Sequence, residues 1–502
     1  MQALAGVVDQ HLDRTVREAF AHGEDAAVLV LEITRAADDS AVVDVDATDP
    51  KYYLDSDKQN VLSLSAPLGG TDPFRPGRGA DGTRLLDLDA GRVWCATTGT
   101  GVFLEARPGE TVTSYVAFGA VDVESVIAFV PQTDFVAVRV IGRDDAAGLG
   151  IDFAAMDKEL EKQKPESSLA APVAIERYTR AIDGSTATLA TDKDVTVTLS
   201  SDVTFDSDSY NLTAAADAQL QTVADQIAQY PDGGSLDIVG HTDDVADDAH
   251  NQKLSEDRAA AVKDRLAQLT DLGKWQVSTT GKGESEPAIK DTTDEARAAN
   301  RRVVTTITPT NGTQNGATPS STPSAAPSSS STPDGNLPES TGPTGKGPDG
   351  VTVAGGFGLG SISVRLAQVQ RRGSLLLGVL EVTGGKGGSV SPLGTGWLAD
   401  PGSVLNNVRG ELGGATSLLA SDGLTLLSGA DRIYPVDYLL PGAAAHRALT
   451  ELELAEILGD GQTSRVCVAW PDTGEDTVMV DHPAGGALPC PWRLTDVPVV
   501  EG

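Results

Sequence analysis

The sequence predicts a multidomain protein in which a central α+β domain is flanked by two predominantly β domains. At 502 residues the chain is too long for a single hydrophobic core, so two to four domains are expected. Both ends of the chain read as short strands separated by Gly, Pro and Asp turns. Only the middle alternates strand patterns with helical ones, which indicates a sheet with helices packed on one face.

Changes in composition and periodicity set the domain boundaries. Residues 26–150 and 351–502 are predicted to be Ig-like β-sandwich domains, since runs of Val, Leu and Ile alternate with turn residues. Residues 151–193 are predicted as a linker and lead-in, and residues 309–350, rich in Ser, Thr, Pro and Gly, as a disordered tether. A helix is predicted for residues 1–25, where apolar residues recur at helical spacing: Leu4, Val7, Val8, Leu12, Val16 and Phe20.

The two flanking regions share a short stretch of sequence. Asp81-Gly82-Thr83-Arg84-Leu85-Leu86 resembles Asp422-Gly423-Leu424-Thr425-Leu426-Leu427, and a second strand follows each stretch at Arg92 and Arg432. We interpret the flanks as two related domains around an unrelated middle. A chance match between two Gly- and Asp-rich strand regions is the alternative.

The charge of the chain excludes some classes of partner. There are 38 basic and 72 acidic residues, a formal net charge of −34, which repels nucleic acid and anionic lipid. No run of about 18 apolar residues predicts a transmembrane helix. The first residues also lack the basic start and apolar core of a signal peptide. Simple solubility explains the acidity, and adaptation to a polyionic surrounding or to bound cations is the alternative.

The cysteines do not predict a metal centre, because Cys95, Cys467 and Cys490 lack CxxC spacing and a nearby His pair. If the protein is exported, Cys467 and Cys490 can form a disulfide, which leaves Cys95 over. No cofactor motif is present: there is no phosphate loop, no HExxH and no Gly-x-Ser-x-Gly elbow. We therefore expect no cofactor and a protein that is not an enzyme.

The segment 194–308 carries the clearest periodicity. A strand over Val195–Phe205 precedes a helical stripe that stops at Pro231. Further strands are predicted at Leu236–His241, Trp275–Thr280 and Arg302–Thr308, and further helices from about Asn251 and over Thr292–Ala299. The stripe of the first helix consists of Ala216, Leu220, Val223, Ile227 and Tyr230.

One charged residue of the second predicted helix is out of place. At 100° per residue, Arg258 falls within the apolar arc of Leu254, Val262 and Leu269. A buried guanidinium needs an acceptor, and Asp243 is the nearest candidate carboxylate in the sequence. A plain ion pair that pins the helix to the sheet explains this pattern as well as a ligand site does.

Five blocks in this segment resemble the signature of the OmpA-like peptidoglycan-binding family. The first block is Val203-Thr204-Phe205-Asp206, and the second is Gly240-His241-Thr242-Asp243. The helical block runs from Asn251 through Leu254-Ser255-Glu256-Asp257-Arg258-Ala259. Gly281-Lys282-Gly283-Glu284 and Asn300-Arg301-Arg302-Val303 complete the order. The match covers under a quarter of the chain and leaves the flanks unassigned.

The resemblance implies a βαβαβ fold that binds the diaminopimelate of peptidoglycan stem peptides. In the family, an Asp and an Arg grip the amino and carboxylate groups of that residue, and these positions correspond to Asp243 and Arg258. Asp206, Thr242, Asn251 and Arg301 match positions that line the same pocket. A carboxylate and a planar guanidinium complement both charges of a zwitterionic amino-acid end. The loop 244–248 departs from the family pattern, with Ala246 where Gly is common and with extra carboxylates.

These patterns predict an extracytoplasmic protein of the cell envelope whose partner is peptidoglycan. Two alternatives remain at this level. In the first, the central domain is a spacer and the β domains bind protein partners as a scaffold. In the second, a carboxylate pair among the acidic residues makes the chain a cell-wall hydrolase. Binding to insoluble peptidoglycan, as opposed to release of its fragments, separates the wall-binding function from the enzyme.

Overall fold

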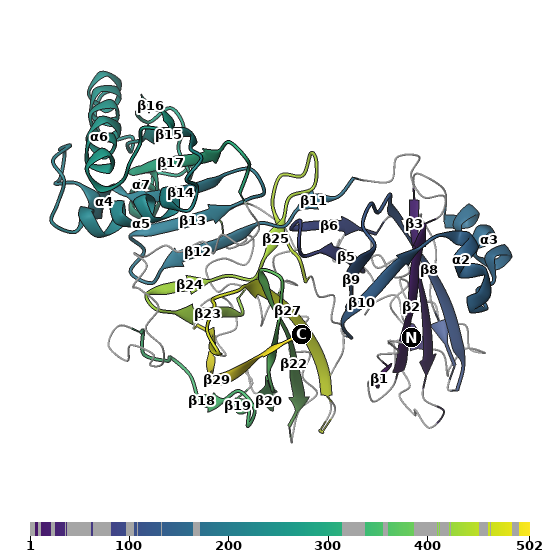
Figure 1. Ribbon diagram of the computed structural model, residues 1–502. Coiled ribbons are helices and arrows are strands. Elements are labelled where there is room, and N and C mark those ends of the chain that lie inside the picture. The colour runs from purple at the N-terminus through teal and green to yellow at the C-terminus, as the bar shows by residue number, and fades with distance from the viewer. Residues whose placement is uncertain are drawn as a thin grey trace.

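The computed structural model shows a β-rich chain with one α+β part (Figure 1). It describes residues 6–8, 12–21, 26–35, 37, 62–63, 82–96, 105–107, 109–131, 133–163, 171–313, 337–354, 360–385, 409, 411, 421, 423–450, 460–461, 463–483 and 491–502. Two β-rich parts lie side by side, and the α+β part lies beside the second of them. Both flanks are thus strand-rich, as predicted, while their Ig-like character stays a prediction.

The N-terminal part is built from two sets of strands around one core. β1 (Gly6–Val8), β2 (Leu12–Ala21), β3 (Ala26–Arg35) and β8 (Thr111–Gly119) form one set. β5 (Arg84–Asp87), β6 (Arg92–Cys95), β9 (Ser125–Val130) and β10 (Asp134–Ile141) form the other, and β10 also pairs with β2. The small pair β4 (Leu62–Ser63) and β7 (Glu105–Ala106) stands apart. Leu31, Leu85, Trp94 and Phe118 are buried between the two sets.

The N-terminal helix predicted for residues 1–25 is wrong, because β1 and β2 occupy that stretch. β2 pairs antiparallel with β3 from Leu12 to Ala21, with a register shift between Val16 and Ala19. β10 adds a parallel contact on its other side. Hydrogen bonding to two neighbouring strands thus overrides a helical spacing that is only a local preference.

Helices cover the outer face of the N-terminal sheet, and the longest of them, α3, lies within the segment 151–193 predicted as a linker and lead-in. α2 (Arg143–Ala146), η2 (Ala147–Leu149) and α3 (Phe153–Gln163) follow β10 directly. Met156 and Leu160 of α3 pack with Val28 and Val30 of β3. The first part of the predicted linker is therefore a helix whose apolar residues dock on a sheet.

The C-terminal part repeats the strand order of the N-terminal one. β24 (Asp431–Ile433), β23 (Thr425–Ser428), β28 (Thr477–His482) and β29 (Trp492–Glu501) are consecutive antiparallel neighbours. β6, β5, β9 and β10 have the same order and directions. This correspondence supports the interpretation of the shared sequence as two related domains.

The other C-terminal strands close a core around two buried tryptophans, Trp470 and Trp492. Most of the first part of the predicted tether 309–350 lies outside the described residues. Residues 337–350 are described, and β18 within them pairs in parallel with β29. The strands not yet named are β18 (Thr344–Lys346), β19 (Val351–Ala354), β20 (Ser361–Arg365), β21 (Val369–Arg372), β22 (Leu375–Gly384), β25 (Asp437–Tyr438), β26 (Arg447–Ala448) and β27 (Thr463–Pro471).

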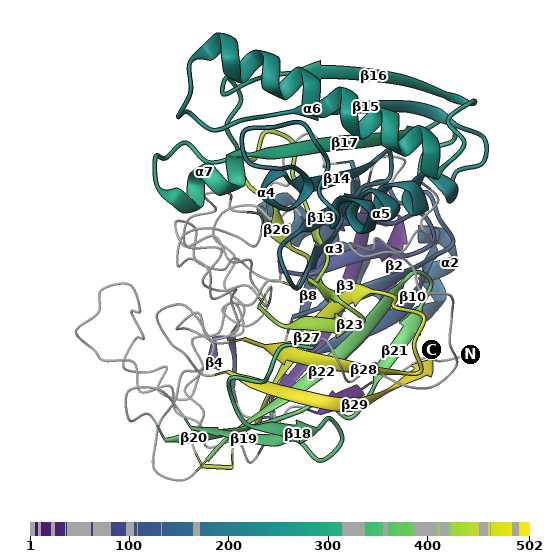
Figure 2. The same ribbon diagram turned by 90° about the vertical axis from the view of Figure 1, so that its left-hand side faces the viewer.

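The central domain is a four-stranded sheet with two long helices on one face (Figure 2). The strand order is β16 (Trp275–Gly281), β15 (Gly234–Gly240), β17 (Arg302–Pro309) and β14 (Val195–Ser200), with β15 and β16 parallel. α5 (Ala216–Ala228) and α6 (Asp248–Leu269) pack on it, while α4 (Ser201–Thr204) and α7 (Asp294–Asn300) are short. The predicted stripe of the first helix is buried, from Ala216 to Tyr230.

Two glycines allow α6 to approach the strand ends. A Cβ on Gly240 would lie 2.1 Å from the carbonyl oxygen of Ser255. A Cβ on Gly281 would lie 2.5 Å from the backbone nitrogen of Glu256. Since real Cβ atoms do not come so close, only glycine permits this contact of helix and sheet. The close packing brings Arg258, one turn further along α6, toward the same end of the sheet.

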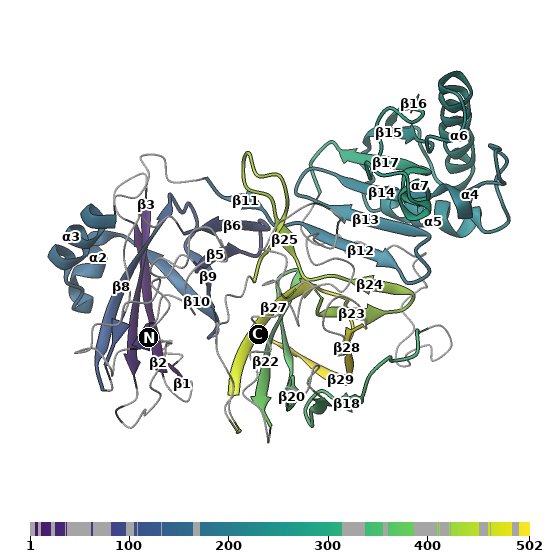
Figure 3. The ribbon, with the colours of Figure 1, turned by 180° about the vertical axis from the view of Figure 1, so that it is seen from behind.

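A hairpin joins the central domain to the C-terminal part in one sheet (Figure 3). β13 (Thr186–Ala190) pairs with β14, and β12 (Arg177–Ala181) pairs with β24. Just before them, β11 (Val173–Ala174) pairs with β6 of the N-terminal part. The second half of the segment 151–193, predicted as a linker and lead-in, is therefore no free linker, because β11 to β13 bridge all three parts through backbone hydrogen bonds.

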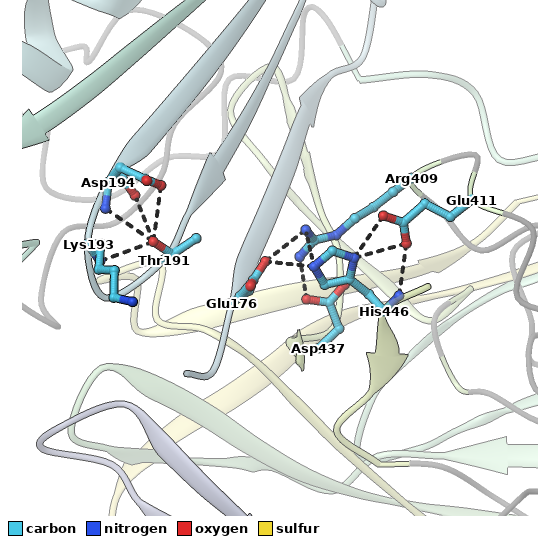
Figure 4. Close-up of polar contacts among 8 residues, drawn as sticks. All are labelled: Glu176, Thr191, Lys193, Asp194, Arg409, Glu411, Asp437 and His446. Atoms are coloured by element: carbon cyan, nitrogen blue, oxygen red, sulfur yellow. Dashed lines mark hydrogen bonds and ion pairs between the residues drawn. The ribbon is translucent and has the colours of Figure 1, made fainter. Parts of the chain in front are cut away.

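An ionic cluster reinforces this junction (Figure 4). The backbones of Glu176 and Asp437 pair as an isolated antiparallel bridge. Arg409 donates to the carboxylates of both residues, and His446 lies between Glu176 and Glu411, 3.0 Å and 2.9 Å from their carboxylate oxygens. Since Arg409 and Asp437 have side chains less than a tenth exposed, these charges depend on one another for compensation.

Candidate functional site

The predicted site residues gather where the central sheet ends. β14 and β15 end at this edge, and β17 begins there, so three connecting segments meet beside the start of α6. They are the turn α4 with the loop that follows it, the loop 241–247 and the residues before β17. Asp243, Arg258 and Arg301 belong to these segments or to α6, and we call them together the Asp243–Arg258 site.

Asp243 is held in a fixed position by the protein. Its Oδ2 accepts a hydrogen bond of 2.7 Å from Nη1 of Arg301, and its Oδ1 accepts one of 3.3 Å from the backbone of Val245. The side chain retains 15% exposure. A carboxylate that is anchored yet reachable can accept a further donor from outside.

Arg301 is fixed by a second carboxylate that sequence reasoning missed. Its Nε and Nη2 donate to the two oxygens of Asp202, both at 2.6 Å, in a bidentate pair. Hydrogen bonds from Asp202 raise the pKa of Arg301, with a further contribution from Asp243 and an opposing one from burial. Asp202 lies in α4, which the sequence predicted as the end of a strand, so its direction could not be anticipated. The only sign of this role in the sequence is the position of Asp202, a charged residue directly before the Val203-Thr204-Phe205-Asp206 block.

Arg258 is 4% exposed, as its place in the apolar arc of α6 predicted. Its Nε donates to the carbonyl oxygen of Ser209 at 2.9 Å, and its guanidinium carbon lies 5.1 Å from the ring centre of Phe205. Burial lowers the pKa of Arg258, while the nearby carboxylates, Asp202 foremost, act in the opposite direction. The direct ion pair with Asp243, one of the two explanations of this pattern, is not formed, and Asp243 pairs with Arg301 instead.

The two terminal nitrogens of Arg258 are the unusual feature of the site. Within the described part of the chain, neither Nη1 nor Nη2 has a hydrogen-bond acceptor, although the residue is buried. A guanidinium offers five donors in a rigid fork, and here Nε alone is engaged. Four donors thus stay available for an anionic group.

Three other predicted residues have different surroundings. Asn251 is buried and its Nδ2 donates to Glu284 Oε2 at 2.6 Å and to the backbone oxygens of Asp243 and Ala246, so it shapes the loop. Thr242 is buried, and its hydroxyl has no hydrogen-bond partner among the described residues. Asp206 is exposed in the neighbouring loop, where its backbone nitrogen donates to the carbonyl oxygen of Asn211.

The acidic loop 244–248 uses its carboxylates within the fold. Asp244 accepts from Arg297 at 2.7 Å, and the side chain of Asp247 caps α6 by accepting from the backbone of His250. Asp248 lies in the first turn of α6, where negative charge is favourable. Across the described residues, no group of three His, Cys, Asp or Glu side chains is arranged to hold a metal ion.

Two further features concern the whole chain. Cys467 is buried in the core between the two β-rich parts, while Cys490, its predicted disulfide partner, lies outside the described residues. No helix in the described ranges combines the length and apolarity needed to cross a membrane.

Comparison with known proteins places the site in a family. Residues 204–301 match the model of the OmpA family, so this segment is an OmpA-family domain within a longer β-rich chain. Outer membrane porin F of Pseudomonas aeruginosa is 44% identical over 102 residues, which is 20% of this chain and 29% of the porin. Outer membrane protein A of Bordetella avium is 38% identical over 107 residues, 21% of this chain and 54% of that protein.

The solved structures cover a similar segment. A cell wall anchor of the T6SS from Pseudomonas aeruginosa is 28% identical, with a TM-score of 0.22, over 25% of this chain and 88% of that one. The peptidoglycan-associated lipoprotein from Burkholderia pseudomallei is 26% identical, with a TM-score of 0.18, over 22% and 86%. The chain spans 29% of the length of the Pseudomonas aeruginosa porin, under a third of it.

Proposed function

We propose that the central domain binds peptidoglycan non-covalently through the diaminopimelate of its stem peptides and so anchors the protein to the cell wall. The observation that carries this proposal is the buried guanidinium of Arg258, whose terminal nitrogens have no acceptor among the described residues, beside the fixed carboxylate of Asp243. The free end of a stem diaminopimelate is a zwitterion. Its carboxylate matches Arg258 and its ammonium matches Asp243.

The geometry also explains why the site suits a ligand with both charges. The Asp202–Arg301 pair already compensates part of the charge of Asp243, and Arg258 is surrounded by the fields of Asp202, Asp208 and Asp243. A simple anion would meet these carboxylates, and a simple cation would meet two arginines. A zwitterion offers each group its opposite charge. The predicted contacts are charge-assisted hydrogen bonds, worth about 1.5–3 kcal/mol each.

Binding to a wall outside the cytoplasm places the protein in the cell envelope, with an extracytoplasmic location. Outer membrane porin F and outer membrane protein A, which are similar to this domain, bear the names of envelope proteins, and this supports the assignment. The function proposed is attachment and not catalysis, since the groups of the site hold charges and none is paired as nucleophile and base.

Co-sedimentation of the full chain with insoluble diaminopimelate-type peptidoglycan tests the proposal. Arg258→Gln and Asp243→Asn should each weaken binding by roughly 10- to 150-fold, the equivalent of one charge-assisted hydrogen bond. Arg265→Gln is the matched control, because Arg265 lies on the same helix but forms an exposed pair with Asp217. Equal retention of all four proteins would refute the site.

A second type of peptidoglycan tests the contact of the Arg258 guanidinium separately from that of Asp243. Peptidoglycan with lysine in place of diaminopimelate keeps the ammonium and lacks the carboxylate. Wild-type protein should bind it more weakly than the diaminopimelate-type wall, and Arg258→Gln should remove the difference. Release of soluble muropeptides by the wild-type chain would instead show that it is a hydrolase.

A further inference from the structure

Two exposed apolar side chains flank the Asp243–Arg258 site. Among the described residues the large hydrophobic side chains with the highest exposure are Val245, at 68%, and Tyr210, at 53%. Val245 lies two residues after Asp243 and donates its backbone N–H to that carboxylate. Tyr210 follows Ser209, whose carbonyl accepts from Arg258. We call these two side chains the apolar rim.

The loop that carries Tyr210 is fixed by its own hydrogen bonds. Phe205 and Leu212 pair as a β-bridge at its base, and the backbone nitrogen of Asp206 donates to Asn211. Asp208 adopts a left-handed backbone conformation, with φ of 50°, and its carboxylate binds His250 of α6 at 2.7 Å. Such a conformation is strained for a residue other than glycine and persists only where its surroundings hold it. The exposure of Tyr210 is therefore a property of a fixed loop.

The loop that carries Val245 is fixed in the same manner. Asp244 on one side of Val245 binds Arg297 of α7. Ala246 on the other side accepts from Asn251, and Asp247 caps α6. Every neighbour of Val245 is thus tied to the domain while its own side chain points to solvent. Single exposed apolar residues are common, but here the two most exposed ones are both preorganised beside one polar site.

We propose that the apolar rim binds the part of the stem peptide and glycan next to the diaminopimelate, so that the site recognises a muropeptide rather than the isolated amino acid. This inference rests on the proposed function. When the zwitterionic end of diaminopimelate binds in the Asp243–Arg258 site, its other end continues into the stem peptide. That peptide must then pass along the loops that carry Tyr210 and Val245. The neighbouring groups of peptidoglycan there are alanine methyls and N-acetyl methyls, which an aromatic ring and an aliphatic side chain can cover.

The test compares two soluble probes on the full chain: a disaccharide tetrapeptide muropeptide that contains diaminopimelate, and free diaminopimelate. Tyr210→Ser and Val245→Ser, singly and combined, remove apolar surface without altering a charge. We expect the double variant to bind the muropeptide roughly tenfold more weakly, as loss of a modest apolar contact predicts, and to bind free diaminopimelate as the wild type does. Leu149→Ser is the matched control, since Leu149 is 41% exposed in the N-terminal part.

The outcomes distinguish the inference from the function beneath it. Muropeptide binding by the double variant at wild-type strength overturns the apolar rim and leaves the Asp243–Arg258 site intact. Weakened binding of both probes also overturns the rim, because it shows that the substitutions disturb the charged site. Failure of the wild type to bind either probe overturns the proposed function itself. A selective loss for the muropeptide supports both.

Discussion

Raising the pH from 6.5 to 9 should selectively weaken the junction between the domains, through His446. This imidazole contacts a carboxylate at each ring nitrogen, Glu176 at Nε2 and Glu411 at Nδ1. Burial alone lowers the pKa of His446, but hydrogen bonds to Glu176 and Glu411 outweigh it and raise the pKa to about 9. In the unfolded chain the value is near 6.5.

The sign and size of the effect follow from this difference. A pKa raised in the folded state gives stability that is fully present below pH 6.5 and is lost as the pH rises through 9. The difference between 6.5 and about 9 corresponds to about 3 kcal/mol. With its side chain 10% exposed, His446 is little screened by solvent. Asp437, whose pKa burial raises to about 6, titrates mostly below this window and adds little to the pH dependence within it.

Urea denaturation followed by tryptophan fluorescence measures the effect, because Trp470 and Trp492 are buried in the C-terminal core. The free energy of unfolding of wild type should fall by about 3 kcal/mol between pH 6.5 and 9. His446→Gln should be less stable at pH 6.5 and lose little more at pH 9. His250→Gln, which removes an exposed histidine from a surface pair, should keep the wild-type slope. The reasoning is refuted if His446→Gln and wild type show the same slope.

Three further predictions concern the central domain. Burial, followed by the charge of Arg302, lowers the pKa of His241 to about 4. Stability that is present above pH 6.5 should therefore be lost as the pH falls, by about 3 kcal/mol at pH 4. Amide exchange across residues 194–308 measures this loss. Gly281→Ala should cost about 1–3 kcal/mol in a thermal melt, while Gly148→Ala, with no atom within 4 Å of the new Cβ, should be neutral. Asp202→Asn should weaken peptidoglycan binding several-fold, by loosening the arginine that fixes Asp243, and pull-down at matched protein concentration measures it.

The sequence was most informative where one periodicity extended over many residues. The stripe from Ala216 to Tyr230 identified α5 and its buried face, and all five of its members are buried. The inward position of Arg258 followed from the same geometry and is observed. Helical spacing follows from local backbone geometry, so it can be read from the sequence, and the tertiary packing of α5 and α6 agrees with it.

Partners across the fold were not predictable in this way. Arg258 donates to a backbone carbonyl of Ser209, and every residue carries such a group, so no side-chain pattern marks it. Asp243 binds Arg301, 58 positions further along the chain, because β17 runs antiparallel to β15 and returns to the edge where β15 ends. The order of strands in the sheet decided this pairing, and one sequence does not reveal that order.

The lead-in to the central domain shows how a composition can mislead. Its Thr- and Ala-rich strands, β12 and β13, have few of the large apolar residues that mark a strand, yet Thr179 and Thr188 are wholly buried and opposite one another. On its other side, Thr179 pairs with Ile433 of the C-terminal part. Backbone hydrogen bonds on both edges, with the Glu176 cluster and the contact of Tyr178 with Tyr434 beside them, hold the hairpin in place. The Asp243–Arg258 site is therefore held at a fixed orientation relative to the C-terminal part.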